Sequence, residues 1–178
     1  MHKLKTQAIA VVGSKKSGKT TTTEKLITEL TKRGYNVAAI KHISEPEFTI
    51  DTPEKDTWRY AQAGAKTIIS AAINEIATIE KTHLTNISLE ALLKKCRGND
   101  IIFIEGFKKL VATKKNIPKI VVVKSMQEAI NALETYKPVL AFSGPYSTEN
   151  SDPKIPYANA LKNPEKLANI IEDNLLKK

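Results

Sequence analysis

The sequence predicts an α/β protein in which a mostly parallel β-sheet lies between two layers of helices. Short apolar runs, which are typical of buried strands, alternate along the chain with segments of helical periodicity. Glycine and proline residues separate most of these segments. Because parallel strands are joined by helical crossovers, helices are expected on both faces of the sheet and ligands at the carboxyl ends of its strands.

Strands are predicted where a short apolar run is bounded by turn residues. Two neighbouring runs flank Asn74 and Glu75 and predict a β-hairpin within the otherwise parallel arrangement. The run Ile101–Ile104 is apolar throughout, which is typical of a central strand buried on both faces. In chain order, the predicted strands are residues 8–12, 35–41, 67–72, 76–80, 101–104, 119–123 and 139–142.

Helices are predicted where apolar residues recur at helical spacing next to capping residues. Thr52 is expected to be the N-cap of a helix that begins at Pro53, and Ser125 with Glu128 predicts a capping box. Cys96 falls on the apolar side of a predicted helix, so a buried and inert thiol is expected. The predicted helices are residues 22–30, 53–63, 89–96, 129–133 and a terminal helix that begins at Asn163–Pro164.

Composition predicts a single domain over residues 1–178, since 41% hydrophobic residues can form a core for a sheet covered on both faces. The basic start at residues 1–5 precedes an apolar run that is too short for a signal peptide or a membrane span. A cytoplasmic protein without a membrane partner is therefore expected. The single cysteine excludes an internal disulfide.

The formal net charge of +9 indicates an anionic partner. Nucleic acid is not expected to be that partner, because base-reading surfaces favour arginine and interleaved aromatic residues. The 28 basic residues include three arginines, Arg33, Arg59 and Arg97. A nucleotide with its metal ion, or an acidic protein, would use the same positive field.

The stretch Gly13–Thr20 fits the pattern G-x-x-x-x-G-K-[ST] of phosphate-binding loops (P-loops) and lies between a predicted strand and a predicted helix. Glycine lets successive main-chain amides turn toward a phosphate, while a threonine hydroxyl in this loop can ligate Mg²⁺. The alternative is a glycine turn that only caps a helix. The sequence thus predicts a P-loop NTPase fold, with nucleotide contacts from Gly13, Ser14, Lys15, Lys16, Ser17, Gly18, Lys19, Thr20 and Thr21.

Glu105 follows the buried run Ile101–Ile104 and is expected at the carboxyl edge beside the glycine loop. There it would hold Mg²⁺ or a water of the metal's shell together with Thr20. Lys19 and Glu105 are the residues expected to support hydrolysis. The alternative for Glu105 is an acid that merely ends a strand, and the glycine loop favours the functional interpretation.

The segment Asp51–Arg59 carries a third charged group. Lys55 and Arg59 stand four residues apart, which suits a phosphate or an acidic partner opposite them, or equally a solvated face with local counterions. Asp51 would be a second carboxylate of the Mg²⁺ sphere, or would only assist the start of a helix. The sequence leaves both alternatives open.

Slow hydrolysis is expected, because the sequence offers no evident water-positioning glutamine and no evident arginine finger. The basic stretch Phe107–Lys115 is interpreted as a loop that leaves the strand of Glu105. This loop would be a docking surface for an acidic partner, or simply solvated lysines. The loop Ser143–Tyr146 is the segment whose position best suits contact with the base.

Several motifs in consistent order over about residues 7–125 resemble the MobB family, the molybdopterin-guanine dinucleotide biosynthesis adapter proteins. These motifs are the glycine loop, Lys41-His42, the stretch Asp51–Arg59 with Ala63-Gly64-Ala65, Glu105-Gly106-Phe107-Lys108 and Pro118-Lys119. The resemblance implies a GTP-binding, Mg²⁺-dependent protein of the SIMIBI-like P-loop group that is usually a homodimer. It also implies weak GTPase activity and assistance to the MobA-type guanylyltransferase that joins GMP to molybdopterin. With this resemblance, a pterin phosphate becomes a further candidate ligand of the basic stretch Phe107–Lys115.

Two departures from the family pattern stand out. Glu54 replaces a residue that is usually glycine, and a histidine-rich stretch after the second strand is reduced to His42. Two other classes of protein are the alternatives. A small-molecule kinase would need an arginine-rich lid and a positioned base, and a metallochaperone GTPase would need paired cysteine or histidine ligands.

Overall fold

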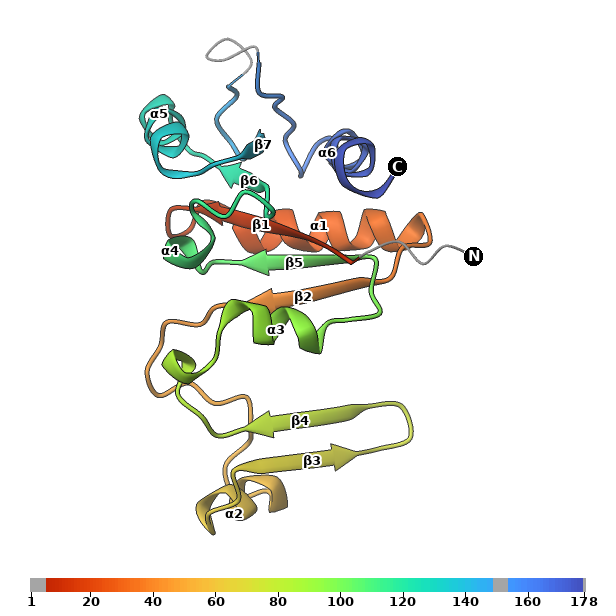
Figure 1. The fold of residues 1–178 in the computed structure, drawn as a ribbon, viewed down its shortest axis with the longest axis vertical. Helices are drawn as coiled ribbons and strands as arrows, with labels where there is room; N and C mark the ends of the chain where they lie inside the picture. Colours follow the sequence, from red (N-terminus) through yellow and green to blue (C-terminus); the bar gives the residue numbers. More distant parts are fainter. Residues whose placement is uncertain (1–5, 149–153, 178) are drawn as a thin grey trace. The chain divides into compact units, whose positions relative to one another are not determined.

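The computed structural model describes residues 6–148 and 154–177 (Figure 1). The described chain forms two compact units. The first unit contains the residues up to His42 and from Leu92 onward, and the second unit contains Ile43–Ala91. Such units occur within single domains as well as between domains, so the single domain over residues 1–178 stays a prediction. The basic residues 1–5 lie outside the described chain.

The first unit is built on a five-stranded sheet with the strand order β2-β5-β1-β6-β7. Every neighbouring pair in it is parallel, which confirms the mostly parallel α/β fold. β1 lies at the centre and is buried over most of its length, as its apolar sequence predicts. The strands are β1 (Gln7–Gly13), β2 (Val37–Lys41), β5 (Ile101–Glu105), β6 (Lys119–Val122) and β7 (Val139–Ser143).

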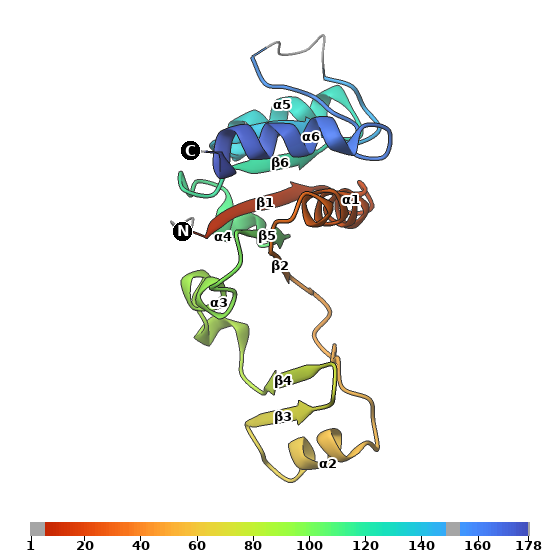
Figure 2. The same cartoon turned by 90° about the vertical axis from the view of Figure 1, so that its right-hand side faces the viewer.

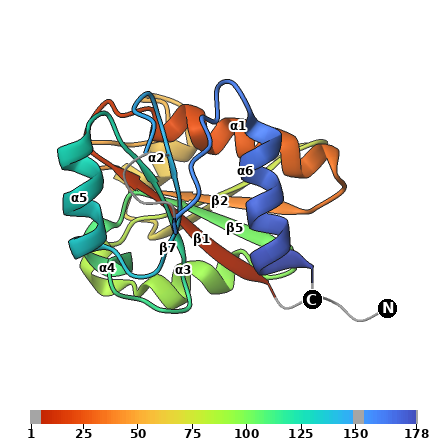
Figure 3. The same ribbon diagram turned by 90° about the horizontal axis from the view of Figure 1, so that it is seen from above.

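Helices cover both faces of this sheet. Seen from above, α1 and α6 lie next to each other on one side of the strands, and α4 and α5 lie on the other side (Figure 3). No helix within the described ranges is both long and apolar enough to cross a lipid bilayer. The helices are α1 (Lys19–Lys32), α4 (Lys108–Val111), α5 (Met126–Thr135) and α6 (Pro164–Ile171), the last extended by a π-helical turn, η2 (Glu172–Leu176).

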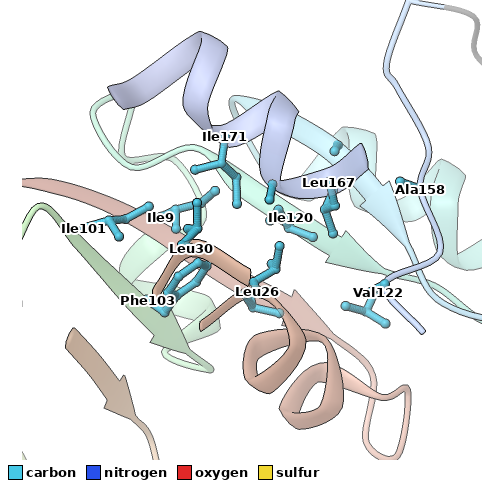
Figure 4. Packing of buried hydrophobic residues seen from close by; sticks show 14 of the residues in the cluster. Ile9, Leu26, Leu30, Ile101, Phe103, Ile120, Val122, Ala158, Leu167 and Ile171 are labelled. Atoms are coloured by element: carbon cyan, nitrogen blue, oxygen red, sulfur yellow. The ribbon is translucent and has the colours of Figure 1, made fainter. Parts of the chain in front are cut away.

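The core of the first unit lies between the sheet and the pair of helices α1 and α6 (Figure 4). Leu26 and Leu30 on α1 are fully buried against side chains from alternate positions of the strands, such as Ile9 and Phe103. Leu167, Ala168 and Ile171 close the same core from α6. The three- and four-residue spacing on the helices and the two-residue spacing on the strands bring these residues to one layer.

Arg33 ties α6 and its extension to the end of α1. Its guanidinium group donates hydrogen bonds to the Glu29 carboxylate at 2.8 and 2.9 Å and to Asn169 Oδ1 at 2.7 Å. It also pairs with the buried carboxylate of Glu172. Although burial acts in the opposite direction, hydrogen bonds from Tyr35 and Arg33 hold the pKa of Glu172 below its ordinary value.

The second unit contains the predicted β-hairpin. β3 (Thr67–Ala71) and β4 (Ile76–Glu80) pair in antiparallel fashion, with α2 (Asp56–Gln62) beside β3 (Figure 2). A 3₁₀ turn, η1 (Leu84–Asn86), leads to α3 (Leu89–Lys95), which crosses into the first unit. The Ser88 hydroxyl caps α3 by accepting a hydrogen bond from the amide of Ala91 at 3.1 Å.

The predicted start of α2 at Pro53 is wrong. The helix begins at Asp56 and its N-cap residue is Lys55 rather than Thr52. Residue Glu54 has a φ of 70°, in the left-handed region, so a right-handed helix cannot pass through it. The family glycine at this position would adopt the same conformation without strain.

Three further expectations are corrected. The stretch Phe107–Lys115 is not a plain loop, because its first turn forms α4. Cys96 lies beyond the last residue of α3 and is only partly buried, although burial still raises the pKa of its thiol. In the capping box of α5, Ser125 Oγ accepts from the amide of Glu128 as predicted, but the Glu128 carboxylate accepts from the amide of Lys124 instead of that of Ser125.

Lys119 is a fully buried lysine in β6. Its ammonium group donates to the main-chain oxygens of Lys114 at 2.9 Å and Lys137 at 2.8 Å. Burial lowers the pKa of Lys119 to about 8. The ammonium group therefore fastens the segment before β6 to the segment before β7.

Replacing Glu54 with glycine is expected to stabilise the second unit by about 1 kcal/mol, because glycine adopts a positive φ without the steric cost of a Cβ atom. Urea unfolding followed by the fluorescence of Trp58 in α2, the chain's one tryptophan, measures the change. Glu54→Ala is the matched control, since it removes the carboxylate but keeps the Cβ atom. An equal gain in both variants would contradict the explanation from backbone strain.

The burial of Lys119 predicts a pH-dependent term in stability. Between about pH 8 and the ordinary lysine pKa of 10.5, the unfolded chain retains a proton that the folded chain has lost, so this term favours folding increasingly as pH rises. The free energy of unfolding of the wild type minus that of Lys119→Met should therefore increase across this range. The same difference in free energy for Lys115→Met, which replaces an exposed lysine, should not change with pH. Equal slopes for the two variants would refute the assignment of this pH dependence to Lys119.

Candidate functional site

The carboxyl ends of the parallel strands bring the chemically active residues of the first unit to one edge. Glu105 at the end of β5 is in register with Val11 of β1 on one side and with Lys41 of β2 on the other. The glycine loop, Gly13–Thr20, follows β1 at the same edge and leads into α1. Since a parallel sheet aligns its strand ends, this convergence follows from the register alone.

The glycine loop has a conformation suited to holding an anion. Lys16 and Gly18 both have positive φ angles, 59° and 96°, and Gly18 is the N-cap residue of α1. Such alternation turns successive amides toward a common point in front of the positive end of the helix. At Gly13 a Cβ atom would run into the carbonyl oxygen of Val122, so the loop packs tightly on β6.

Lys19 reaches back across the loop, and its ammonium group donates to the main-chain oxygen of Ser14 at 2.6 Å. Burial and the nearby ammonium group of Lys108 lower the pKa of Lys19. Lys41 and Lys124 act in the same direction more weakly, and Glu105 opposes them. Four positive groups facing one loop repel one another, and a polyanion bound there would relieve that repulsion.

Thr20, Glu105 and Lys41 form a closed polar cluster beside the loop. The Thr20 hydroxyl donates to Glu105 Oε1 at 2.8 Å, and Lys41 Nζ lies 3.2 Å from Thr20 Oγ1 and 3.3 Å from Glu105 Oε1. The Glu105 side chain is only 12% exposed. A hydroxyl and a carboxylate that converge on one point are ligands that Mg²⁺ accepts, so these residues fit the predicted metal.

Two hollows flank the glycine loop. One, of about 240 Å³, lies between the loop and the segment after β7, and its lining includes Gly18, Thr21, Gly144 and Asn159. The other, of about 170 Å³, lies against β6 and α5 and is lined by Gly13, Ser14, Lys108, Glu128 and others. A ligand held by the loop therefore has room on both sides.

The first hollow includes the segment Ser143–Tyr146 that the sequence indicated for base contact, through Ser143, Gly144 and Pro145. Its other wall, Asn159–Leu161, was not predicted from the sequence. The wall is held in place by the amide of Ala160, which donates to Ser143 Oγ at 3.3 Å. The sequence Asn-Ala-Leu of this wall carries no motif that would have marked it.

Lys41 is the other residue whose place in the site was not predicted. It was noted in a family motif but not assigned to the site, although it ends an apolar strand in the same way as Glu105 does. His42, next to it, packs its ring on that of Phe107, with 4.9 Å between the ring centroids. Gly106 leaves room for this contact, because a Cβ atom there would come within 3.0 Å of His42 Cβ.

Asp51, Lys55 and Arg59 belong to the second unit, and their expected roles toward metal and phosphate stay predictions. Asp51 Oδ1 accepts a hydrogen bond from the Thr57 hydroxyl at 2.8 Å, while its Oδ2 is buried without a hydrogen-bond partner among the described residues. Arg59 pairs with Asp56 at 3.5 Å on the exposed surface of α2. Asp51 thus helps to fix the start of α2.

Fold and site define an α/β protein whose parallel sheet presents a glycine loop and a nearly buried carboxylate at one edge. The chain belongs to the MobB family: the family model described as "Molybdopterin guanine dinucleotide synthesis protein B" matches residues 8–143. This match confirms the resemblance carried by the sequence motifs and includes both units of the structure.

Curated relatives and solved structures agree with this assignment. The chain is 33% identical over 144 residues to the molybdopterin-guanine dinucleotide biosynthesis adapter protein of Haemophilus influenzae, a match that covers 79% of this chain and 76% of that protein. It is 32% identical over 131 residues to a probable adapter protein of Bacillus subtilis, covering 71% and 69%. The crystal structure of Bacillus subtilis MobB matches with a TM-score of 0.75 at 22% identity, over 97% of this chain and 99% of that one, and supports the fold.

Replacing Lys19 with alanine is expected to weaken the binding of inorganic triphosphate by about ten-fold or more, because a charge-assisted hydrogen bond contributes roughly 1.5–3 kcal/mol. Calorimetric titration with triphosphate measures the loss. Lys25→Ala, which removes an exposed lysine from the same helix, is the matched control and should change affinity by less than about two-fold. Unchanged binding in Lys19→Ala would exclude the glycine loop as the anion site.

Proposed function

We propose that this protein is a GTP-binding adapter with slow intrinsic GTPase activity that assists the guanylyltransferase joining GMP to molybdopterin. The observation that carries the proposal is the Thr20–Glu105 pair, closed at 2.8 Å beside the lysine-rich glycine loop. The family assignment supplies the pathway, since the relatives are named as molybdopterin-guanine dinucleotide biosynthesis adapter proteins.

In this proposal the amides of the glycine loop and Lys19 bind the β- and γ-phosphates, and Thr21 contacts the α-phosphate. Thr20 and Glu105 hold Mg²⁺, while the metal role expected of Asp51 in the second unit stays a prediction from the sequence. The bound metal would neutralise charge on the phosphates. The chain's own part is to hold the triphosphate at the N-terminal end of α1 and to surround it with ammonium groups.

The nucleoside would occupy the hollow beside Gly144, whose walls offer main-chain groups and the Asn159 side chain. Asn159 Oδ1 already accepts from the amide of Leu161 at 2.9 Å, which fixes the amide group's orientation. In the described chain, no carboxylate lines this hollow to read the 2-amino group of guanine. The preference for guanine over adenine is therefore supported by the family assignment and not by the lining of the hollow.

Hydrolysis is expected to be slow. The glycine loop and the linings of the two hollows contain neither glutamine nor arginine within the part of the chain that the structure describes. The usual devices that position water or neutralise the transition state would then have to come from a partner. This is the behaviour expected of an adapter that responds to nucleotide, and we propose that it works in the cytoplasm together with its partner enzyme.

The basic segment around α4 is the proposed docking surface for that enzyme. Lys109 and Lys115 are exposed there, and Lys108 at the start of α4 also lines a hollow at the glycine loop. Nucleotide bound at the loop would thus lie next to the docked surface. An acidic face on the MobA-type partner is the complement that this charge requires.

We propose that a second copy of the chain packs against the exposed apolar side chains of the second unit. Within residues 43–91, all of which the structure describes, just Ile68 and Leu89 are buried. An isolated two-stranded hairpin is marginally stable in water, and large exposed apolar surfaces mark association sites. The exposed apolar side chains of this unit are Phe48, Ile50, Tyr60, Ile69, Ile73, Ile76 and Leu84.

Calorimetry with GTP, ATP and the two diphosphates, each with Mg²⁺ and with a chelator, tests the proposal. Tight binding of GTP with Mg²⁺ and binding of ATP that is weaker by about five-fold or more are expected, since a lost polar match at a base costs roughly 1–3 kcal/mol. Phosphate release should be slow alone and rise with the partner enzyme.

Equal affinities for GTP and ATP would refute the guanine-specific function. Fast phosphate release by the isolated protein would refute the adapter role, because no partner would then be needed. If the protein bound triphosphates without any preference for the nucleoside, the site would recognise the phosphates and not the base.

A further inference from the structure

We propose that Lys41 is a built-in cation of the metal site: its ammonium group occupies the position between the two Mg²⁺ ligands before the metal binds, and the metal has to displace it. The inference rests on the proposed function, because it concerns how Mg²⁺ and nucleotide share one site. It assigns to Lys41 a positioning role that lowers the dependence of nucleotide binding on Mg²⁺.

The distances place Lys41 directly on the metal ligands. Its Nζ atom lies 3.2 Å from Thr20 Oγ1 and 3.3 Å from Glu105 Oε1, the same oxygen to which Thr20 donates. Lys41 and Glu105 are opposite each other in the register of β2 and β5. The pairing of β2 with β5 therefore brings the Lys41 ammonium group next to the Glu105 carboxylate.

The environment explains why a cation is needed there. Glu105 is nearly buried, and a desolvated carboxylate is costly without a positive partner. The Lys41 side chain is 51% exposed and has a long flexible stem, so it can leave for solvent or for a phosphate oxygen at little cost. Glu105 is the fixed partner of this pair and Lys41 the movable one.

Mg²⁺ and the ammonium group cannot bind the same two oxygens together. The metal needs its oxygen ligands at about 2.0–2.1 Å and repels a second positive charge at that range. Two occupied forms follow: one without metal, in which Lys41 adds charge for the phosphates, and one with metal, in which Lys41 has moved away. Lys41 thus raises nucleotide affinity when Mg²⁺ is scarce and competes with the metal when it is abundant.

Lys41→Met tests this inference through binding alone. The dissociation constant for GTP is measured by calorimetry with saturating Mg²⁺ and again with excess chelator. The constant with chelator divided by the constant with Mg²⁺ is the ratio that is compared between variants. In Lys41→Met the ratio should rise by about five-fold, because affinity without metal falls and Mg²⁺ no longer displaces an ammonium group. Lys41→Arg keeps the charge and should stay near the wild-type ratio.

The matched control is Lys124→Met. Lys124 is another ammonium group that lowers the pKa of Lys19, but it bonds to the main-chain oxygen of Lys15 at 3.4 Å rather than to the metal ligands. Its loss should weaken GTP binding equally with and without Mg²⁺ and leave the ratio unchanged. In a Glu105→Gln background, Lys41→Met should also leave the ratio unchanged, because the carboxylate that pairs with Lys41 is gone.

The outcomes separate the two proposals. If the wild type binds no GTP under either condition, the proposed function fails. If the wild type binds GTP but Lys41→Met shifts both constants equally, Lys41 is only part of the general positive field and the inference is overturned. Lys41→Gln, whose amide preserves polarity, replaces Lys41→Met should the latter fail to fold, and the same ratio decides.

Discussion

The parallel register of β2, β5 and β1 is the constraint on which the site depends. It sets Glu105 between Val11 and Lys41, and it starts the glycine loop two residues after Val11. A shift of one residue would turn Glu105 toward the opposite face of the sheet and separate it from Thr20. The apolar side chains that fix the register, such as Ile9 and Phe103, are therefore as important to the site as its polar residues.

The edge of the sheet that carries the site has an excess of positive charge that the residues of the site do not balance. Lys19, Lys41, Lys108 and Lys124 share one small region, and burial and mutual repulsion lower the pKa of Lys19. The carboxylate of Glu105 offsets part of this effect on the pKa of Lys19. A triphosphate would balance the excess positive charge, which links the stability of the loop to the presence of ligand.

Much of the fold was predictable because local signals were strong. Continuous apolar runs marked the buried strands, and Ser125 marked the start of α5 where the structure has it. The start of α2 was not predictable from its capping residues, because Glu54 takes a conformation that the sequence alone assigns to glycine. The wall Asn159–Leu161 was missed because its role comes from position and not from residue type.

By itself the sequence determined the glycine loop, the order of strands and helices, the strand that ends in Glu105 and the family, because these depend on residue type and spacing along the chain. The tertiary structure alone decided that Lys41 meets Thr20 and Glu105, and that the segments after β7 form a hollow beside the loop. Such contacts join residues far apart in the chain. They depend on strand order and register, which are set by packing of the whole sheet rather than by any local pattern.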